Sequence, residues 1–266
     1  GAGCGLATAI VYWVMFVGML AYAYYSKHLK QAPLFTQFYW PQWSEIKVIL
    51  ALGTPIAFSL LFEVSLFAAV AIILIPFGAN VVASHQIAIN FSGLVFMVPL
   101  SLAMAVTIKV GFEVGNKNLE KAKELCRYSV ILGLIIAVAT AAATLIFKTQ
   151  IAAIYTSDTE VLELAAGLMF LAALFQFSDA IQVISAGALR GYKDTKSILY
   201  ITFFSYWVVG LSFGLILGLT DWIAPASGPY GFWIGFISGL TVAAVLLAWR
   251  LKVVQNRFDQ QAALAS

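Results

Sequence analysis

The 266-residue sequence contains little charge, since only 10% of its residues are Asp, Glu, Lys or Arg. Soluble domains carry roughly 25% charged residues, and they need that polar surface to stay dispersed in water. Hydrophobic residues make up 62% of this chain instead. The composition therefore excludes a soluble globular domain and predicts an integral membrane protein whose main partner is the lipid bilayer.

The residues that most enzymes use are also scarce. Two histidines and two cysteines are too few for a His- or Cys-based metal centre, and the cysteines lack CxxC spacing. The phosphate-binding GxxxxGK[ST] loop is absent from the sequence. The basic residues form no continuous stripe interleaved with aromatics, which argues against a nucleic-acid partner. The sequence predicts neither an enzyme nor a cofactor.

Long apolar segments dominate what is present. A membrane-spanning helix needs about 20 apolar residues, and seven segments are long enough. They cover residues 6–25, 48–75, 81–110, 128–147, 162–189, 198–219 and 230–249. The sequence thus predicts an all-α membrane protein with seven transmembrane helices. The chain begins Gly-Ala-Gly without an initiator Met or a signal cleavage site, so we expect it to be the C-terminal part of a longer protein.

The basic residues predict an orientation in the membrane. If the loop after the first segment is cytoplasmic, fourteen of the fifteen Lys and Arg residues lie on the cytoplasmic side, Arg190 among them, and Lys148 alone lies outside. This asymmetry is what the positive-inside rule describes. We therefore expect an external N-terminus and a cytoplasmic C-terminus.

One connection suggests a boundary between structural units. Residues 31–43 contain Pro33, Pro41 and five aromatic side chains, and Tyr and Trp favour the headgroup layer. We predict one spanning helix in residues 1–30, an interfacial linker in residues 31–44, a six-helix unit in residues 45–254 and a polar cytoplasmic tail in residues 255–266.

Two acidic residues lie near the middle of long apolar segments. Glu63 interrupts the second segment, and Asp179 lies within the fifth. A carboxylate at membrane depth costs several kcal/mol and usually faces a cavity or an ion path. Each could instead be a buried acid bonded to a neighbouring helix. The cost of desolvation favours a functional interpretation, in which carboxylate oxygens bind a hard cation such as Na⁺.

Several polar residues could line the same cavity. Gln176 and Gln182 lie three residues before and after Asp179, close to one helical face, and Ser178 adds a hydroxyl. These residues could equally form polar contacts between helices. His85 could relay protons or be a buried histidine with its partners satisfied, and Asn90 is more typical of a helix contact.

Three segments carry a resemblance to a known family. They read ATAIVYW at residues 7–13, SHQIAINFSGLVFMVPLSLAMA at 84–105 and SDAIQVISAGALRGYKDT at 178–195. In these segments, and over nearly its whole length, the chain resembles the multidrug and toxic compound extrusion (MATE) family of the bacterial NorM type. The resemblance implies a twelve-helix transporter with two six-helix lobes. This chain would hold the last helix of the N-lobe and the complete C-lobe, and the rest of the N-lobe would be its partner.

The resemblance also implies a function. Family members export organic, mostly cationic drugs across the bacterial inner membrane in exchange for Na⁺ or H⁺. Glu63 and Asp179 match the acidic C-lobe positions that NorM-type members use for the cation. Phe175 stands one turn before Asp179, where a tyrosine could offer a hydroxyl ligand, so the choice between Na⁺ and H⁺ stays open.

Two other membrane functions can be compared with this one. A retinal protein needs a lysine in its last spanning helix, and residues 230–249 contain none. A flippase for lipid-linked precursors, from the superfamily that shares the MATE fold, should have several buried Arg or Lys residues for a polyanionic headgroup. The predicted segments show none at membrane depth, which favours the antiporter.

Overall fold

The computed structural model describes residues 2–26 and 40–265. Within these ranges, seven helical spans are long and apolar enough to cross a membrane, so the predicted all-α membrane architecture is confirmed. They are Gly5–Tyr25, Trp43–Phe77, Ala79–Gly115, Leu119–Tyr155, Thr159–Gly191, Thr195–Leu219 and Pro229–Leu264. The chain divides into two compact units, residues 1–48 and 49–266. Most of the predicted linker at 31–44 falls outside the described residues.

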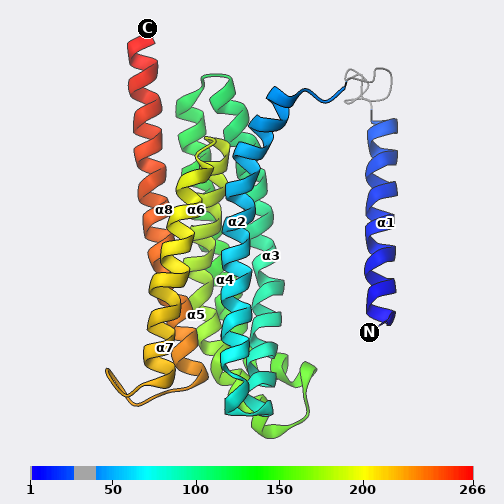
Figure 1. Ribbon diagram of the computed structural model, residues 1–266, viewed down its shortest axis with the longest axis vertical. Coiled ribbons are helices and arrows are strands. Elements are labelled where there is room, and N and C mark those ends of the chain that lie inside the picture. Colours follow the sequence, from blue (N-terminus) through cyan, green and yellow to red (C-terminus); the bar gives the residue numbers. More distant parts are fainter. Residues whose placement is uncertain (1, 27–39, 266) are drawn as a thin grey trace. The chain divides into compact units, whose positions relative to one another are not determined.

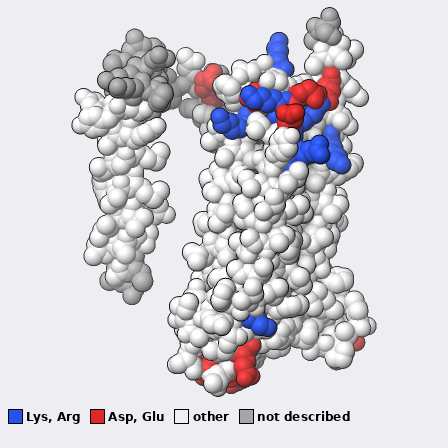
Figure 2. Space-filling model, turned by 180° about the vertical axis from the view of Figure 1, so that it is seen from behind, with Lys and Arg blue, Asp and Glu red and all other residues white. Residues whose placement is uncertain are grey.

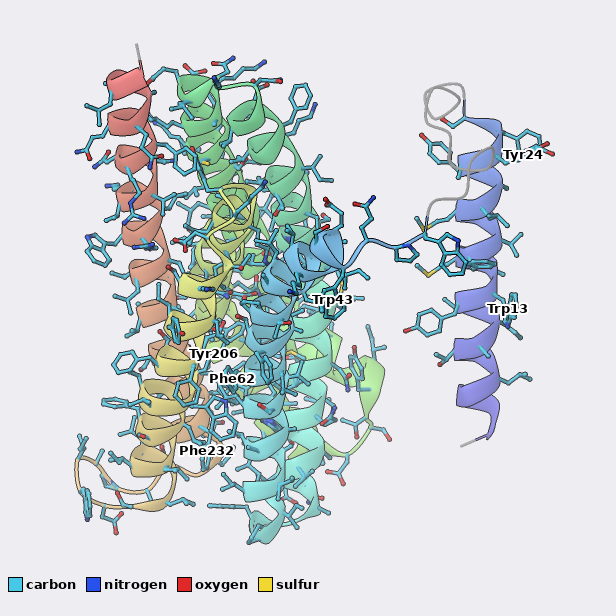
Figure 3. The ribbon with its side chains drawn as sticks, turned by 45° about the horizontal axis from the view of Figure 1, so that its top comes forward. Trp13, Tyr24, Trp43, Phe62, Tyr206 and Phe232 are labelled. Carbon is cyan, nitrogen blue, oxygen red and sulfur yellow. The ribbon has the colours of Figure 1, made fainter. Side chains whose placement is uncertain are left out.

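The first unit contains the helix α1 (Ala2–Tyr25) and the start of α2 (Trp43–Ile73). With 24 residues, α1 is about 36 Å long, which exceeds the ~30 Å hydrocarbon core of a bilayer. Aromatic side chains such as Trp13 and Tyr24 project from it (Figure 3). The Trp13 and Phe16 rings meet edge to face at 6.0 Å. This outward apolar surface is typical of a helix in contact with lipid or with other membrane helices.

The second unit is a bundle of long helices that run alongside one another (Figure 1). After α2 and the short 3₁₀ turn η1 (Ile75–Phe77), its elements are α3 (Ala79–Gly115), α4 (Leu119–Tyr155), α5 (Thr159–Gly191), α6 (Thr195–Phe203), the π-helical turn η2 (Phe204–Gly210), α7 (Leu211–Leu219) and α8 (Pro229–Ala265). Because α6, η2 and α7 follow one another without a break, they form a single span.

The centre of the bundle is α5, which packs against α3, α4 and α8. It is buried around most of its circumference, as expected for a helix whose residues are apolar on every side. Small residues let its neighbours approach closely. A Cβ atom added to Gly187 would lie 2.5 Å from the Ala103 carbonyl oxygen of α3. The residues carried by α5 are therefore held in fixed positions.

The pair α7 and α8 also packs backbone against backbone. A Cβ atom on Gly235 would lie 2.6 Å from the carbonyl oxygen of Gly210, and glycines recur every four residues on both helices, as in close membrane-helix pairs. Residues 210–214 read Gly-Leu-Ser-Phe-Gly, which matches the GxSxG pattern of serine hydrolases. The structure places this stretch inside a helix and not at the strand-to-helix turn that such a nucleophile needs. These glycines serve helix packing.

In contrast, α2 is joined to the rest of the bundle through both aliphatic and aromatic side chains, and its Leu66 and Val70 are buried in one cluster with Phe232 of α8. The ring of Phe62 lies 4.9 Å from that of Phe203, and the ring of Phe67 lies 4.9 Å from that of Phe236. The indole Nε1 of Trp207 donates a 3.2 Å hydrogen bond to the Phe62 carbonyl oxygen. Figure 3 shows Phe62 near the middle of α2. The described contacts between α2 and the other helices therefore run mainly through side chains.

The last helix is longer than predicted. The sequence indicated a span ending near Trp249 and a polar tail, but α8 continues as a helix to Ala265. Packing explains this difference, since the Phe258 ring meets the Tyr192 ring at 5.3 Å. Asp259 also pairs with Lys123 of α4 at 2.7 Å. These contacts stabilise the helix after Trp249, where the sequence is less hydrophobic than in the predicted span.

Charged side chains gather at the two ends of the second unit, and an uncharged band separates them (Figure 2). At one end, the Arg250 Nε atom donates a 2.7 Å hydrogen bond to Asp194, which also accepts a 2.8 Å bond from Ser197. Glu113 pairs with Lys121 at 3.0 Å. The uncharged band is the surface expected of helices that cross a bilayer.

Candidate functional site

Both mid-membrane acids line one cavity in the second unit. Its volume is about 250 Å³, and its lining residues come from α2, α3, α5 and α8. Glu63 comes from α2 and Asp179 from α5, and both Phe175 and Gln182 of α5 also border it. The structure therefore brings together four of the residues that the sequence suggested.

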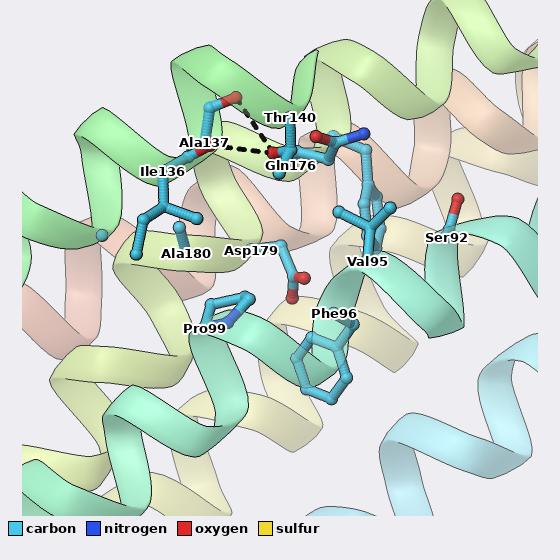
Figure 4. Close-up of a pocket in the computed structure, with 12 residues that line it drawn as sticks. Ser92, Val95, Phe96, Pro99, Ile136, Ala137, Thr140, Gln176, Asp179 and Ala180 are labelled. Carbon is cyan, nitrogen blue, oxygen red and sulfur yellow. Dashed lines mark hydrogen bonds between the residues drawn. The ribbon is translucent and has the colours of Figure 1, made fainter. Parts of the chain in front are cut away.

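Asp179 is deeply placed, with only 4% of its surface exposed. Its carboxylate also faces a smaller pocket beside Phe96 and Pro99 of α3 (Figure 4). Proline has no N–H, so Pro99 cannot donate the usual helical hydrogen bond to the carbonyl of Val95. Val95 lines that same pocket. Pro99 therefore leaves one helical hydrogen bond unformed in the part of α3 that lines this pocket.

Uncharged oxygen atoms complete the surroundings of the two acids. Ser92 Oγ and Gln182 Oε1 are buried without a hydrogen-bond partner, and both residues line the cavity. Hard cations such as Na⁺ prefer carboxylate, hydroxyl and carbonyl oxygens, so this donor set fits such an ion. In the described part of the chain, no cluster of three or more His, Cys, Asp or Glu side chains could hold a metal ion.

Arg190 is the residue that sequence reasoning misplaced. We expected it in a cytoplasmic loop, yet it lies in the last turn of α5 and lines the cavity with Glu63 and Asp179. Its Nε atom is buried without a partner. Spacing could have revealed this, because Arg190 follows Asp179 by eleven residues, or about three helical turns. The sequence analysis found no basic residue at membrane depth and did not anticipate that Arg190, at the end of α5, lines the cavity.

Two predicted polar residues of α5 have partners on neighbouring helices. Gln176 Nε2 donates a 3.0 Å hydrogen bond to Thr144 Oγ1, and Gln176 lines the smaller pocket beside Asp179. Ser178 and Thr241 share a hydrogen bond of 2.8 Å between their hydroxyls. Neither Gln176 nor Ser178 borders the larger cavity. Their described contacts join α5 to α4 and α8.

The two candidates on α3 also lie away from the larger cavity. His85 is buried, and its Nδ1 atom accepts a 3.3 Å hydrogen bond from the indole Nε1 of Trp233. Trp233 itself borders the cavity. His85 therefore contacts a lining residue and does not line the cavity itself. Asn90 is exposed and does not line the cavity.

Tyr206 is a further residue that the sequence analysis missed. It lies in the π-helical turn η2, is fully buried, and its hydroxyl has no hydrogen-bond partner. Single π-helical turns occur frequently at functional sites. Nothing in the apolar sequence around Tyr206 distinguishes a π turn from an ordinary α-helix.

The sequence was compared with known proteins. Residues 55–216 match the family described as MatE. The chain is 52% identical over 260 residues to the multidrug resistance protein NorM of Photobacterium profundum, covering 98% of this chain and 57% of that protein. It is 50% identical over 257 residues to the multidrug resistance protein MdtK of Yersinia pseudotuberculosis serotype O:1b, covering 97% and 56%. The chain thus spans little more than half the length of these curated relatives.

Solved structures share the fold. The eukaryotic MATE transporter AtDTX14 superposes with a TM-score of 0.84 at 18% identity, over 96% of this chain and 57% of that one. An outward-facing multidrug resistance MATE family transporter of the MOP superfamily gives a TM-score of 0.81 at 22% identity, over 92% and 55%. The arrangement of helices around the cavity is therefore a known membrane-transporter architecture.

Proposed function

Because this chain belongs to the MatE family, we propose that it forms part of a secondary active transporter that exports organic, mostly cationic drugs in exchange for Na⁺ or H⁺. The observation that carries the proposal is the cavity in which Glu63 and Asp179, from two different helices, face the same space. The relatives named multidrug resistance proteins support the drug-efflux part. The protein acts as a transporter and not as an enzyme.

The two carboxylates supply a physical basis for exchange. Both acids repel one another when they are ionised in a medium of low dielectric constant, and a bound cation or proton relieves this repulsion. A ligand shifts a conformational equilibrium only by its different affinity for the two states. If the coupling ion and the drug compete for Glu63 and Asp179, binding of one releases the other, which is antiport.

The coupling ion is left as Na⁺ or H⁺ in this proposal. The carboxylates, Ser92 Oγ and Gln182 Oε1 offer oxygen ligands that suit Na⁺. A proton would need a single carboxylate. Phe175 borders the cavity but carries no hydroxyl, so it adds no ligand for either ion.

The charge of the cavity does not favour the lipid-precursor flippase. A polyanionic headgroup calls for several basic side chains, whereas the lining combines Arg190 with two acids. An organic cation suits this balance better. We further propose that the protein lies in the bacterial inner membrane with its C-terminus in the cytoplasm, as the distribution of Lys and Arg indicates.

The test uses a full-length transporter that carries this chain. Glu63→Gln and Asp179→Asn should each reach the membrane and lose Na⁺- or H⁺-driven uptake of a fluorescent organic cation into inverted vesicles, in which export from the cytoplasmic face appears as accumulation in the lumen. The matched control is Glu163→Gln, which neutralises an exposed acid on the same helix as Asp179 and should transport normally. Wild-type efflux with both cavity substitutions present would refute the proposal.

A further inference from the structure

The cavity contains charge of both signs. Its lining includes the carboxylates of Glu63 and Asp179 and the guanidinium of Arg190. Arginine stays protonated in proteins. When both acids are ionised, the three side chains therefore carry a net charge of −1, whereas the acid pair alone would carry −2.

The geometry of α5 directs Arg190 into this space. Positions eleven residues apart lie on nearly the same face of an α-helix, so Arg190 and Asp179 share the face that borders the cavity. Side chains of a helix lean toward its N-terminus, which for Arg190 is the direction of Asp179. This direction agrees with the presence of Arg190 in the lining of the cavity that holds both acids.

Arg190 is also separate from the ion pairs at that end of the bundle. There Arg250 pairs with Asp194 at 2.7 Å and Lys123 pairs with Asp259 at 2.7 Å. The Nε atom of Arg190 is instead buried and has no hydrogen-bond partner among the residues that the structure describes, and Arg190 lines the same cavity as Glu63. A buried cation is costly unless an acid compensates it, and the acids that line the cavity with Arg190 are Glu63 and Asp179.

We propose that Arg190 is an internal counter-ion of the cavity, which neutralises one of the two acidic charges and competes with the incoming cation for Glu63. This inference rests on the proposed function and deepens it. A cavity with a net charge of −1 is neutralised by one monovalent cation. Arg190 would therefore select monovalent over divalent cations, and it would weaken binding enough for the bound ion to be released.

The experiment measures cation binding to the purified chain in detergent by isothermal titration calorimetry. The wild-type chain should bind one Na⁺. Arg190→Gln should bind Na⁺ about tenfold more tightly, because the Coulomb energy lost with a nearby unit charge lies between its values at the dielectric constants of water and of protein. The variant should also take up a second Na⁺. Its affinity for Ca²⁺, which has a similar radius but twice the charge, should rise more than its affinity for Na⁺.

Three variants control the interpretation. Lys196→Gln removes an exposed cation close to the same end of the bundle and should bind Na⁺ like the wild type. Arg190→Lys keeps the charge and should retain single-ion binding. The double variant Glu63→Gln with Arg190→Gln again has a net charge of −1 and should bind one Na⁺. A purely structural role for Arg190 predicts weaker binding in Arg190→Gln, opposite to the expected change.

The outcomes separate this inference from the proposed function. If Asp179→Asn abolishes Na⁺ binding but Arg190→Gln leaves the affinity unchanged or lowers it, the counter-ion role is refuted and the cation site stands. If Asp179→Asn and Glu63→Gln leave Na⁺ binding unchanged, the cation site itself fails. Should Arg190→Gln not fold, the wild-type stoichiometry still decides, because two bound Na⁺ ions would contradict the proposal.

Discussion

Two helical glycines of the second unit differ in what surrounds them. A Cβ atom on Gly187 would lie 2.5 Å from the Ala103 carbonyl oxygen, whereas a Cβ atom on Gly53 would meet nothing within 4 Å. The obstacle at Gly187 is backbone, which cannot rotate away. We expect Gly187→Ala to destabilise the protein by about 1–3 kcal/mol, the usual cost of overpacking, as measured by unfolding in detergent.

Gly53→Ala is the matched control. It introduces the same methyl group into open space and replaces a poor helix former by a good one, so its stability should equal or exceed that of the wild type. Equal stability of Gly187→Ala and the wild type would show that α3 and α5 are not in the close contact described here.

At the scale of residues, the sequence revealed acids more readily than their surroundings. Glu63 and Asp179 could be predicted because a charge inside a long apolar segment is conspicuous. Arg190 was less conspicuous, because at a helix end a basic residue resembles one that faces the cytoplasm, and only its spacing of eleven residues from Asp179 indicates a shared face. Its position in the cavity follows from the three-dimensional packing of α5, which hydropathy does not encode.

At the scale of elements, α2 depends on few directional contacts. Trp207→Phe removes the hydrogen bond from the indole Nε1 to the Phe62 carbonyl oxygen, whose net value is about 0.5–1.5 kcal/mol. We expect faster amide hydrogen exchange in α2 and little change in α5, measured by mass spectrometry. Trp249→Phe alters an indole that is 62% exposed and should leave exchange in α2 unaffected. Unchanged exchange in Trp207→Phe would contradict this account of how α2 is held.

Element number was easier to predict than element length. The count of seven follows from apolar runs, because a bilayer demands about 20 such residues per helix. Hydropathy cannot show that α8 continues past Trp249, since the contacts of Phe258 and Asp259 with other helices stabilise that extension. The π-helical turn at Phe204–Gly210 likewise leaves no trace in an apolar sequence.

At the scale of the whole molecule, the orientation can be tested by cysteine labelling. In a background without Cys4 and Cys126, Ser157→Cys should react with an impermeant maleimide in intact cells. Lys117→Cys should react only after permeabilisation, because the excess of Lys and Arg marks the cytoplasmic side. Both positions are exposed in the structure. Labelling of Lys117→Cys in intact cells would reverse the proposed orientation.

The chain alone should bind a cation but not transport. Alternating access in transporters with internal repeats is largely a rocking of one half against the other around a shared site, and this chain spans 57% of the length of its NorM relative. We expect no ion-driven drug accumulation by liposomes that contain only this chain. The same chain should still bind Na⁺ through Glu63 and Asp179. Robust ion-dependent transport by the chain alone would contradict this expectation.

The contrast between α5 and α2 has a mechanical consequence. Asp179 lies on α5, which packs closely against three neighbouring helices, whereas Glu63 lies on α2, which contacts its neighbours through aliphatic and aromatic side chains. An ion bound between the two carboxylates would pull on both helices with equal and opposite forces. The tightly packed α5 would resist this force more than α2. The displacement produced by ion binding would therefore be concentrated in α2.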